Sequence, residues 1–399
     1  MSAAKRSTAT TDAFGPHLAG RQVTVLGAGI GGLACASAFA QAGAQVTVLE
    51  QAPELREVGA GLQVTPNGAR VIRALGLTEA YDAGGIAAAA VWPMDALTGR
   101  VIARFDLGRT DPAYRFFHRA DLQRMLADGA KAHGATIRTG IRALGLAPGG
   151  RIETDHGPVE ADLIVGADGV HSIARLFCDT GARPTDFTGQ VAWRAVVPCQ
   201  DEPPVARIWM APGRHVVTYP LSQGRMNIVA VQEREEWAEE GWHHHDDPDN
   251  LRAAFADCGP DLRAILHRVE ETRLWGLFRH PVAQDWHGER IAVLGDAAHP
   301  TLPFLAQGAN LALEDSLVLA RCCAGLPLDR ALPRYQALRR DRVIRAIEAA
   351  NANARNYHLS GARRRAAHLG LGVMDKLAPS MFLGRFSWLY EYDAASVTP

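Results

Sequence analysis

A glycine-rich segment near the N-terminus constrains the fold more than any other part of the chain. Gly27, Gly29 and Gly32 have the spacing G-x-G-x-x-G, directly after the β-branched run at residues 23–26. An alanine-rich stretch with helical character follows, and then a second apolar run that ends at Glu50. This order of strand, glycine turn, helix and strand predicts a parallel βαβ unit that binds a dinucleotide.

Each part of this unit has a physical role in binding. Gly27 permits the tight turn, Gly29 lets backbone N–H groups approach a pyrophosphate, and Gly32 allows the helix to pack closely on the strand. The N-terminus of the helix adds partial positive charge. Glu50 can accept hydrogen bonds from ribose hydroxyls and would repel a 2′-phosphate, so NADP is not expected at this site. The motif alone does not distinguish NAD from FAD.

The composition is that of an ordinary globular protein. The chain has 399 residues, 47% hydrophobic and 21% charged, which is enough for two domains or for one domain with a large insertion. The net charge is −1 without a long basic run, so neither nucleic acid nor an anionic membrane is expected as a partner.

Residues 1–20 contain no apolar signal core and are expected to form a loose tail, and no window is apolar enough to span a bilayer. The six cysteines lack C-x-x-C spacing, which favours reduced thiols in a cytoplasmic protein.

Two further segments have the pattern of a buried strand that ends in a polar turn and enters a helix. One places Asp168 in its turn, and the other ends on Gly295-Asp296. Ligands of open α/β sheets bind beyond the carboxyl ends of strands, so both turns are candidates for a binding site. Asp296 can accept hydrogen bonds from a polyol, and the helix predicted to begin at Gly308 can stabilise negative charge with its first N–H groups.

Between residues 185 and 280 the pattern changes to alternating strands, which predicts an antiparallel sheet. His215 and Tyr219 share one face of a strand in this sheet, because side chains alternate along a strand. Their backbones would be about 13 Å apart, which leaves room for an aromatic ligand between their side chains. Without other context, two amphipathic residues on a sheet surface are the better interpretation.

The run His243-His244-His245-Asp246-Asp247 contains metal-ligating residue types. Adjacent side chains cannot all point at one ion without strain, and the flanking residues are polar. We therefore expect a solvated loop and no metal site.

The three glycine motifs, in this order, resemble the aromatic-ring hydroxylases, which are single-component FAD-dependent flavoprotein monooxygenases. The matching segments are Gly27–Gly32, Asp162–Arg175 and Gly295-Asp296. The resemblance covers about residues 22–360 and extends to the C-terminal stretch WLYEYDA. It implies FAD as cofactor and NADH, or NADPH, as a transient co-substrate.

The resemblance implies an α/β fold, with a Rossmann-like FAD-binding domain, an inserted antiparallel-sheet substrate domain and C-terminal helices. Its predicted parts, in chain order, are a tail at 1–20, the first FAD-binding part at 21–184 with an excursion near 90–112, the substrate-binding sheet at 185–280, the second FAD-binding part at 281–325, and a helical region at 326–399.

The resemblance also implies which residues hold the cofactor. Asp168 would lie near the pyrophosphate and also serve NAD(P)H, and Asp296 would bind the ribityl chain. The helix that begins at Gly308 would face the N1–C2=O edge of the isoalloxazine ring, where it would stabilise the anionic reduced flavin. The implied cofactor-binding residues are Gly27, Gly29, Ile30, Gly31, Glu50, Gln51, Gln63, Arg119, Asp168, Asp296, Gly308, Ala309, Asn310 and Leu311.

The branch that the chain most resembles contains salicylate 1-hydroxylase, 3-hydroxybenzoate 6-hydroxylase and 6-hydroxynicotinate 3-monooxygenase. Residues 59–64 and the pattern His215-x-x-x-Tyr219-Pro220-Leu221 are similar to the second of these, in which the matching histidine and tyrosine contact or activate the phenol. The chain departs at Pro303-Phe304, where that enzyme has glutamine in place of the proline. The exact substrate and the ring position therefore stay open.

The implied reaction is hydroxylation of a small aromatic substrate by NAD(P)H and O₂, through a flavin C4a-hydroperoxide that must be shielded from water. The substrate would be a phenolic or N-heteroaromatic carboxylic acid, bound by Gln63, His215, Tyr219 and Pro303. His215, with an ordinary pKa near ~6.5, is the expected base, and Tyr219 would orient the hydroxyl. The alternatives are an FAD-dependent dehydrogenase or reductase that inserts no oxygen and a non-catalytic flavin-binding sensor. The chain is expected to be a monomer or a homodimer.

Overall fold

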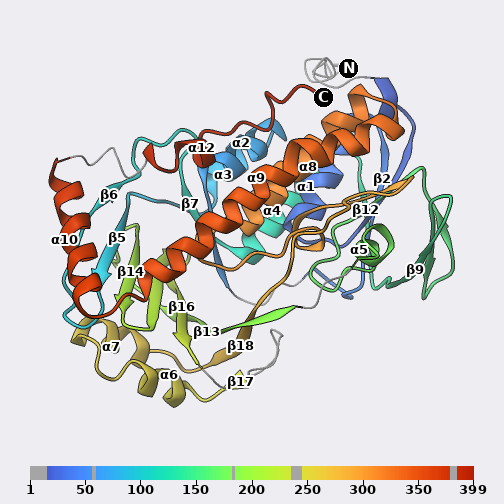
Figure 1. The fold of residues 1–399 in the computed structure, drawn as a ribbon. Helices are drawn as coiled ribbons and strands as arrows, with labels where there is room; N and C mark the ends of the chain where they lie inside the picture. The colour runs from blue at the N-terminus through green and yellow to red at the C-terminus, as the bar shows by residue number, and fades with distance from the viewer. Residues whose placement is uncertain (1–15, 56–59, 182–184, 235–244, 378–383) are drawn as a thin grey trace, which may run out of the picture.

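The computed structural model describes residues 16–399, apart from 56–59, 182–184, 235–244 and 378–383 (Figure 1). Most of the predicted tail lies outside the described residues. Pro16–Leu18 form a short 3₁₀ helix, and Leu18 is buried in the core. The prediction of a loose tail is therefore wrong for these last residues.

Five parallel strands form the first layer, in the order β19-β12-β1-β2-β8. Numbered along the chain, this is the Rossmann order 3-2-1-4-5. The order reverses between β1 and β12, so the carboxyl ends of these two strands lie side by side. The strands are β1 (Gln22–Leu26), β2 (Gln45–Glu50), β8 (Thr136–Thr139), β12 (Leu163–Gly166) and β19 (Ile291–Val293).

Helix α1 (Ile30–Gln41) is buried over most of its length, because its residues are small enough to pack closely. A Cβ added to Gly31 would lie 2.8 Å from Leu294 and 3.1 Å from Ala312. Ala312 belongs to α8 (Gly308–Gly325). Gly31 is therefore a position where α1 and α8 pack against each other.

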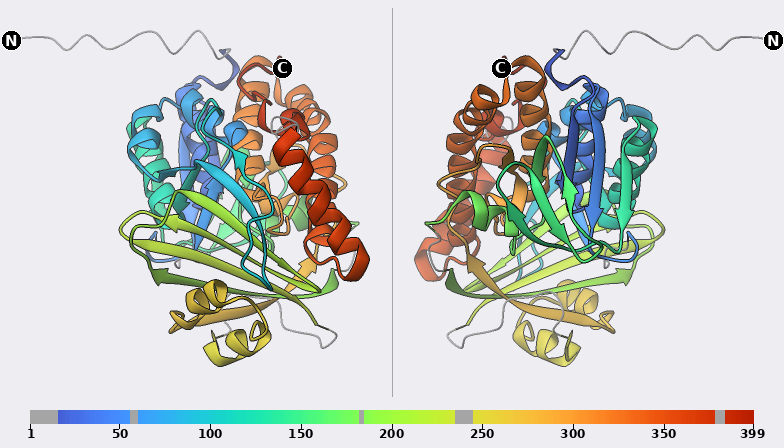
Figure 2. Two further views of the ribbon diagram at one scale, coloured as in Figure 1. Left: turned by 90° about the vertical axis from the view of Figure 1, so that its left-hand side faces the viewer. Right: turned by 90° about the vertical axis from the view of Figure 1, so that its right-hand side faces the viewer.

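An eight-stranded sheet forms the second layer, in the order β17-β18-β13-β16-β15-β14-β5-β6. Figure 2 shows it beneath the parallel sheet, with α6 (Pro248–Ala254) and α7 (Pro260–His267) on its far face. Strand β5 pairs in parallel with β14, so part of the segment near 90–112 belongs to this sheet. The strands are β5 (Ala90–Asp95), β6 (Phe105–Asp106), β13 (Asp186–Pro198), β14 (Val205–Ala211), β15 (Arg214–Leu221), β16 (Arg225–Glu233), β17 (His245–Asp246) and β18 (Thr272–Arg279).

The two faces of this sheet have separate apolar clusters. Val191 and Trp193 pack with α6 and α7, whereas Ala192 packs with Phe304 on the opposite face. The face that carries Ala192 is directed at the loop before α8. It is therefore the face that can enclose a ligand between the layers.

Smaller elements complete the described part of the chain. Two three-stranded sheets contain β3 (Gly61–Val64), β4 (Ile86–Ala87) and β7 (Arg115–His118), and β9 (Ala143–Ala147), β10 (Arg151–Thr154) and β11 (Val159–Glu160). The other helices are α2 (Pro66–Ala74), α3 (Thr78–Ala83), α4 (Arg119–Ala132), α5 (Ile173–Cys178), α9 (Leu328–Tyr357), α10 (Gly361–Leu377) and α12 (Ser387–Tyr390). None of the helices in the described ranges has the length and apolar character that crossing a lipid bilayer requires.

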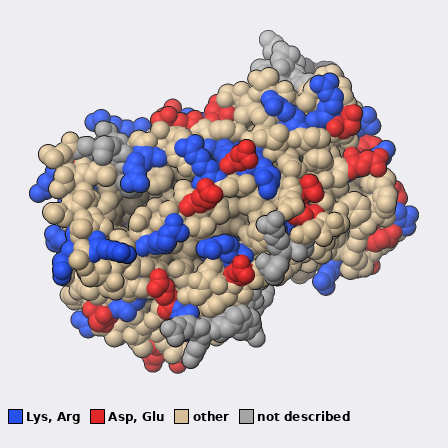
Figure 3. All heavy atoms as spheres, in the orientation of Figure 1, with Lys and Arg blue, Asp and Glu red and all other residues tan. Residues whose placement is uncertain are grey.

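Charges of both signs are interspersed on the face shown in Figure 3, where α9 crosses the molecule. Beneath that helix, a group of charges is fully buried. Arg339 of α9 lies 2.7 Å from Glu314 and 2.7 Å from Asp315, both of α8. Arg342 forms a two-pronged ion pair with Glu314 at 2.8 Å. Burial raises the pKa of Asp315, but the charges of His299 and Arg339 outweigh it and lower the value to about 2.

Replacing Arg339 by methionine should destabilise the protein by about 3–5 kcal/mol, because the buried Asp315 would lose its arginine partner and the buried Glu314 would keep only Arg342. Arg330→Met is the matched control, since Arg330 lies on the same helix but is exposed, and its loss should cost less than about 0.5 kcal/mol. Urea unfolding followed by tryptophan fluorescence measures both variants. Equal losses would show that the buried pairs have no special weight.

Candidate active site

The three glycine motifs meet at the carboxyl edge of the parallel sheet. Gly27 has φ +95°, and a Cβ there would lie 2.5 Å from the carbonyl oxygen of Ala167, so only glycine fits where the first two motifs touch. The third motif is joined to the second by a hydrogen bond from Leu294 N–H to the Gly166 carbonyl at 3.0 Å. The segments predicted to share one binding site are therefore adjacent in space.

The first motif has the form of a dinucleotide site. Gly29 precedes α1, and no protein atom lies within 4 Å of a Cβ added there. Because this glycine is not required by packing, the open space beside it suits the close approach of a pyrophosphate. Glu50 accepts hydrogen bonds from the N–H groups of Ala28 and Ala52, both at 2.8 Å, so its carboxylate lies beside the turn.

The remaining residues predicted around this motif have different surroundings. Ile30 is buried in the first turn of α1, and Gln51 is exposed just beyond β2. Gln123 of α4, which the sequence analysis did not identify, donates a hydrogen bond to the Ala28 carbonyl at 2.9 Å. Its position 95 residues from the motif gave no local signal.

Asp296 and Arg119 form the polar wall of the site. Asp296 is exposed to solvent, yet enough protein surrounds it that desolvation raises its pKa, with His299 and Arg119 opposing the shift. Burial lowers the pKa of Arg119, and the charge of Asp296 opposes that shift in turn. A solvent-accessible acid that interacts electrostatically with an arginine suits the hydroxyls and phosphates of FAD.

The side chain of Asp168 accepts hydrogen bonds within its own turn. It accepts hydrogen bonds from Ser172 Oγ at 2.5 Å and from the N–H of Ile173 at 2.9 Å, at the start of α5. Burial raises its pKa, and the bond from Ser172 acts in the opposite direction. Contact of Asp168 with a pyrophosphate or with NAD(P)H stays a prediction.

The first residues of α8 differ in burial and in hydrogen bonding. Gly308 and Ala309 are half-buried, whereas Asn310 and Leu311 are fully buried. Asn310 accepts a hydrogen bond from Thr65 N–H at 3.0 Å and donates one to the Gln63 carbonyl at 3.0 Å, which fastens α8 to β3. Gln307 provides no side-chain cap, so the first N–H groups of this long helix can face an anionic group.

His215 lies on the face of β15 that is directed toward the loop before α8. Its Nδ1 is 2.7 Å from Nε2 of His358, and its ring centroid is 5.8 Å from that of Phe304. Tyr357 packs on the same imidazole, with the centroids 5.1 Å apart. Pro303, next to Phe304, is half-buried, so both residues of the Pro303-Phe304 pair border this region.

Tyr219 lies four residues beyond His215, on the same face of β15. Its ring packs on Phe116 with the centroids 5.0 Å apart, and it forms a hydrogen bond with Gln63. Tyr114 donates a second hydrogen bond to Gln63. The structure thus brings Gln63 and Tyr219 together at one end of the face, with His215 at the other.

Burial shifts the pKa values of both His215 and Tyr219. Burial lowers the pKa of His215 well below the ordinary value of histidine, and the charge of His358 adds to the effect. Burial also raises the pKa of Tyr219 above its usual range, although Arg194 and Gln63 act in the opposite direction. Both side chains are therefore neutral at neutral pH.

Arg194 of β13 is a cation on this face that the sequence analysis missed. Its guanidinium lies 4.8 Å from the centroid of the Trp275 ring, and burial lowers its pKa to about 10. It interacts electrostatically with both Tyr219 and Arg119. The alternation along β13 could have placed it on the same face as Ala192.

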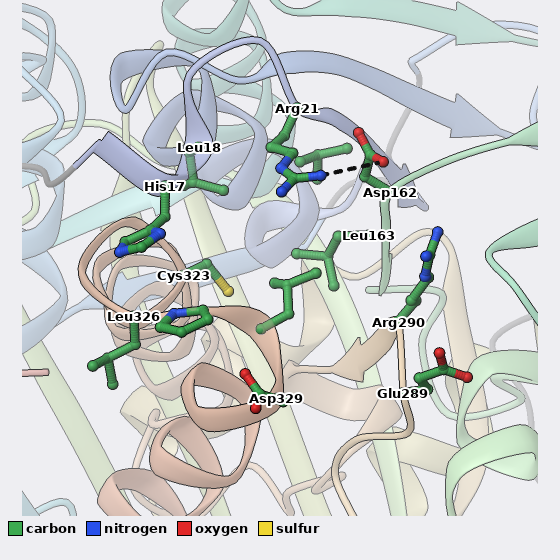
Figure 4. Close-up of a pocket in the computed structure, with 13 residues that line it drawn as sticks. His17, Leu18, Arg21, Asp162, Leu163, Glu289, Arg290, Cys323, Leu326 and Asp329 are labelled. Atoms are coloured by element: carbon green, nitrogen blue, oxygen red, sulfur yellow. Dashed lines mark ion pairs between the residues drawn. The ribbon is translucent and has the colours of Figure 1, made fainter.

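Two other regions do not contribute to this site. His243 and His244 lie outside the described residues, and Asp246 of β17 accepts a hydrogen bond from Trp193 Nε1 at 2.6 Å. The described residues contain no group of three side chains placed to hold a metal ion. A cavity of about 320 Å³ lies at the opposite edge of the parallel sheet, where Arg21 and Asp162 pair at 3.7 Å (Figure 4).

Comparison with known proteins identifies the class. Residues 21–350 match the family model described as FAD binding domain. The chain is 34% identical over 396 residues to 3-amino-4-hydroxybenzoate 2-monooxygenase PtnB3 of Streptomyces platensis, covering 94% of this chain and 97% of the relative. It is 32% identical over 399 residues to 3-hydroxybenzoate 6-hydroxylase of Polaromonas naphthalenivorans, covering 94% and 96%. The structure of Klebsiella pneumoniae HpxO complexed with FAD and uric acid superposes with a TM-score of 0.80 at 25% identity, covering 91% and 95%.

The chain belongs to this FAD-binding family, and within it to the aromatic-ring flavoprotein monooxygenases. The predicted fold class, enzyme class and FAD cofactor are confirmed. NAD(P)H is the reductant typical of this family. The open space at Gly29, the exposed carboxylate of Asp296 and the uncapped start of α8 fit FAD.

Two glycine variants separate binding from folding. Gly29→Ala should leave the thermal unfolding temperature of the apoprotein unchanged and weaken FAD binding about tenfold, or about 1.4 kcal/mol, because its methyl group meets only the cofactor. Gly27→Ala should lower both the unfolding temperature and the affinity for FAD, because its Cβ collides with Ala167 and its φ is positive. The expected loss of folding stability is about 1–3 kcal/mol. Fluorescence titration with FAD and thermal unfolding measure the two effects. Unchanged affinity in Gly29→Ala would place the pyrophosphate elsewhere.

Proposed function

We propose that this enzyme hydroxylates a small aromatic acid that carries a ring hydroxyl group, with His215 as the base that accepts the hydroxyl proton. The observation that carries the proposal is the face of β15, where His215 packs on Phe304 of the loop that precedes α8 and Tyr219 lies on the same face beside Gln63. The substrates named for the two relatives above, 3-amino-4-hydroxybenzoate and 3-hydroxybenzoate, both have a ring hydroxyl and a carboxylate. Arg194 is a cation on this face and suits the carboxylate.

FAD, when bound, supplies the oxygen-transfer chemistry after reduction by NAD(P)H. The residues of the chain prepare the substrate. A phenolate ring reacts faster with an electrophilic oxygen than the neutral phenol does, so removal of the hydroxyl proton by His215 activates it. Tyr219 is neutral and can donate a hydrogen bond that fixes the hydroxyl group. Phe304 and Tyr357 exclude water from the imidazole.

Turnover tests the proposal directly. Purified, FAD-loaded protein should oxidise NADH or NADPH with matching oxygen uptake when given 3-amino-4-hydroxybenzoate or 3-hydroxybenzoate, and the product should contain one added hydroxyl group. Salicylate, 4-hydroxybenzoate and 6-hydroxynicotinate extend the panel, and benzoate, which has no ring hydroxyl, is the negative control. His215→Gln should lower kcat about 100-fold or more, because the base is lost. Slow peroxide formation with every compound would contradict the substrate class.

The pH dependence follows from the lowered pKa of His215. A base with a lowered pKa stays deprotonated, and therefore active, as pH falls through 6.5, and it loses activity only below its own shifted pKa. The kcat profile at saturating substrate should therefore show no acid limb near ~6.5. The measurement is steady-state NADH oxidation between about pH 5 and 9, the range in which an unperturbed histidine would titrate. A limb near ~6.5 that disappears in His215→Gln would show that His215 titrates normally.

A further inference from the structure

Three titratable side chains form a continuous line from the substrate face of the sheet to the protein surface. Nδ1 of His215 lies 2.7 Å from Nε2 of His358, and Nδ1 of His358 lies 2.8 Å from Oε1 of Glu233. Both histidines are buried, whereas the Glu233 side chain is 55% exposed. The line therefore begins in the dry interior and ends in water.

Backbone hydrogen bonds hold the three residues in this order. His215 lies near the start of β15, Glu233 ends β16, and His358 directly follows α9. Gly213 joins the last two, because its N–H donates to the His358 carbonyl at 3.1 Å and its carbonyl accepts from Glu233 N–H at 2.8 Å. The alignment is thus built into the way α9 ends against the sheet.

The hydrogen-bond partners determine where the protons are. The carboxylate of Glu233 only accepts, so Nδ1 of His358 carries its proton and Nε2 of His358 is an acceptor. Nδ1 of His215 must then donate to His358. Nε2 of His215 keeps its lone pair, which can accept a proton from a bound ligand.

We propose that His358 and Glu233 form a proton relay that carries the substrate hydroxyl proton from His215 to bulk water. This inference rests on the proposed function, in which His215 accepts that proton. The substrate O–H bond breaks as Nε2 of His215 gains the proton, and the Nδ1–H bond of His215 breaks as Nε2 of His358 gains one. His358 passes its Nδ1 proton to Glu233, which releases it to water. The same steps in reverse reprotonate the product oxygen and restore the original tautomers.

The surroundings of His215 explain why a relay is needed. A charged imidazole is unfavourable in this buried position, as the lowered pKa of His215 also indicates. Burial lowers the pKa of His358 too, but its hydrogen bond to Glu233 acts in the opposite direction. The other rings packed on His215 are Phe304, which does not titrate, and Tyr357, whose pKa burial raises. Passing the proton outward leaves both imidazoles uncharged.

A chromophoric phenol can test the relay without turnover. The probe is 3-hydroxy-4-nitrobenzoate, whose phenolate is coloured, mixed in a stopped-flow instrument with FAD-loaded, oxidised protein at a pH where the free probe is protonated. The wild type should form the bound phenolate rapidly and release a proton to an indicator dye. Glu233→Gln and His358→Gln should bind the probe with unchanged affinity but ionise it about tenfold more slowly or worse. Glu233→Asp should recover most of the rate.

Asp257→Asn is the matched control. Asp257 pairs with Arg214, the neighbour of His215 in sequence, but lies outside the relay, so this variant should ionise the probe at the wild-type rate. Glu233 is exposed, so its substitution should not disturb folding even if His358→Gln does, and thermal unfolding checks both. Wild-type rates in Glu233→Gln and His358→Gln, with a slow His215→Gln, would overturn the relay and leave His215 as the base. Wild-type ionisation in His215→Gln, or none in the wild type, would instead overturn the proposed function.

Discussion

The buried ion pairs between α8 and α9 are the interaction on which the rest of the structure depends. Glu314 and Asp315 are fully buried, and two buried carboxylates are tolerated only where cations and hydrogen-bond donors satisfy them. Besides Arg339 and Arg342, Glu314 accepts from Asn67 at 2.7 Å, and Asp315 accepts from the Gly295 N–H at 3.1 Å. The same charges therefore fix the start of α2 and the turn that carries Asp296. The position of the predicted FAD site follows from how these carboxylates are satisfied.

Helix α9 connects these buried ion pairs to the eight-stranded sheet. It has 30 residues and is therefore about 45 Å long. Its middle supplies the two arginines that hold α8, and its end delivers Tyr357 and His358 to the imidazole of His215. One rigid element thus sets the cofactor side and the substrate side at a fixed distance.

The sequence could predict those features that depend on short-range pattern. The glycine motifs were recognisable because turn, helix start and strand end lie within a few residues, and alternation was enough to place His215 and Tyr219 on one face. The partners that determine their chemistry come from far away in sequence: His358 is 143 residues from His215, and Arg339 is 24 residues from Asp315. Their burial is decided by tertiary packing, so neither the lowered pKa of His215 nor the buried charges of Glu314 and Asp315 could be predicted from the sequence.

The neutral state of His215 has a functional consequence that its identity alone does not reveal. The site has to exclude water while it exchanges a proton with water, and these two demands conflict if the proton leaves by solvent entry. A pair of neutral imidazoles resolves the conflict, because each nitrogen that gains a proton is matched by one that loses a proton. Among the three relay residues, only Glu233, at the surface, changes its charge. The low basicity of His215 is then an advantage, because a base that held its proton would leave a cation in the dry interior and stop the transfer.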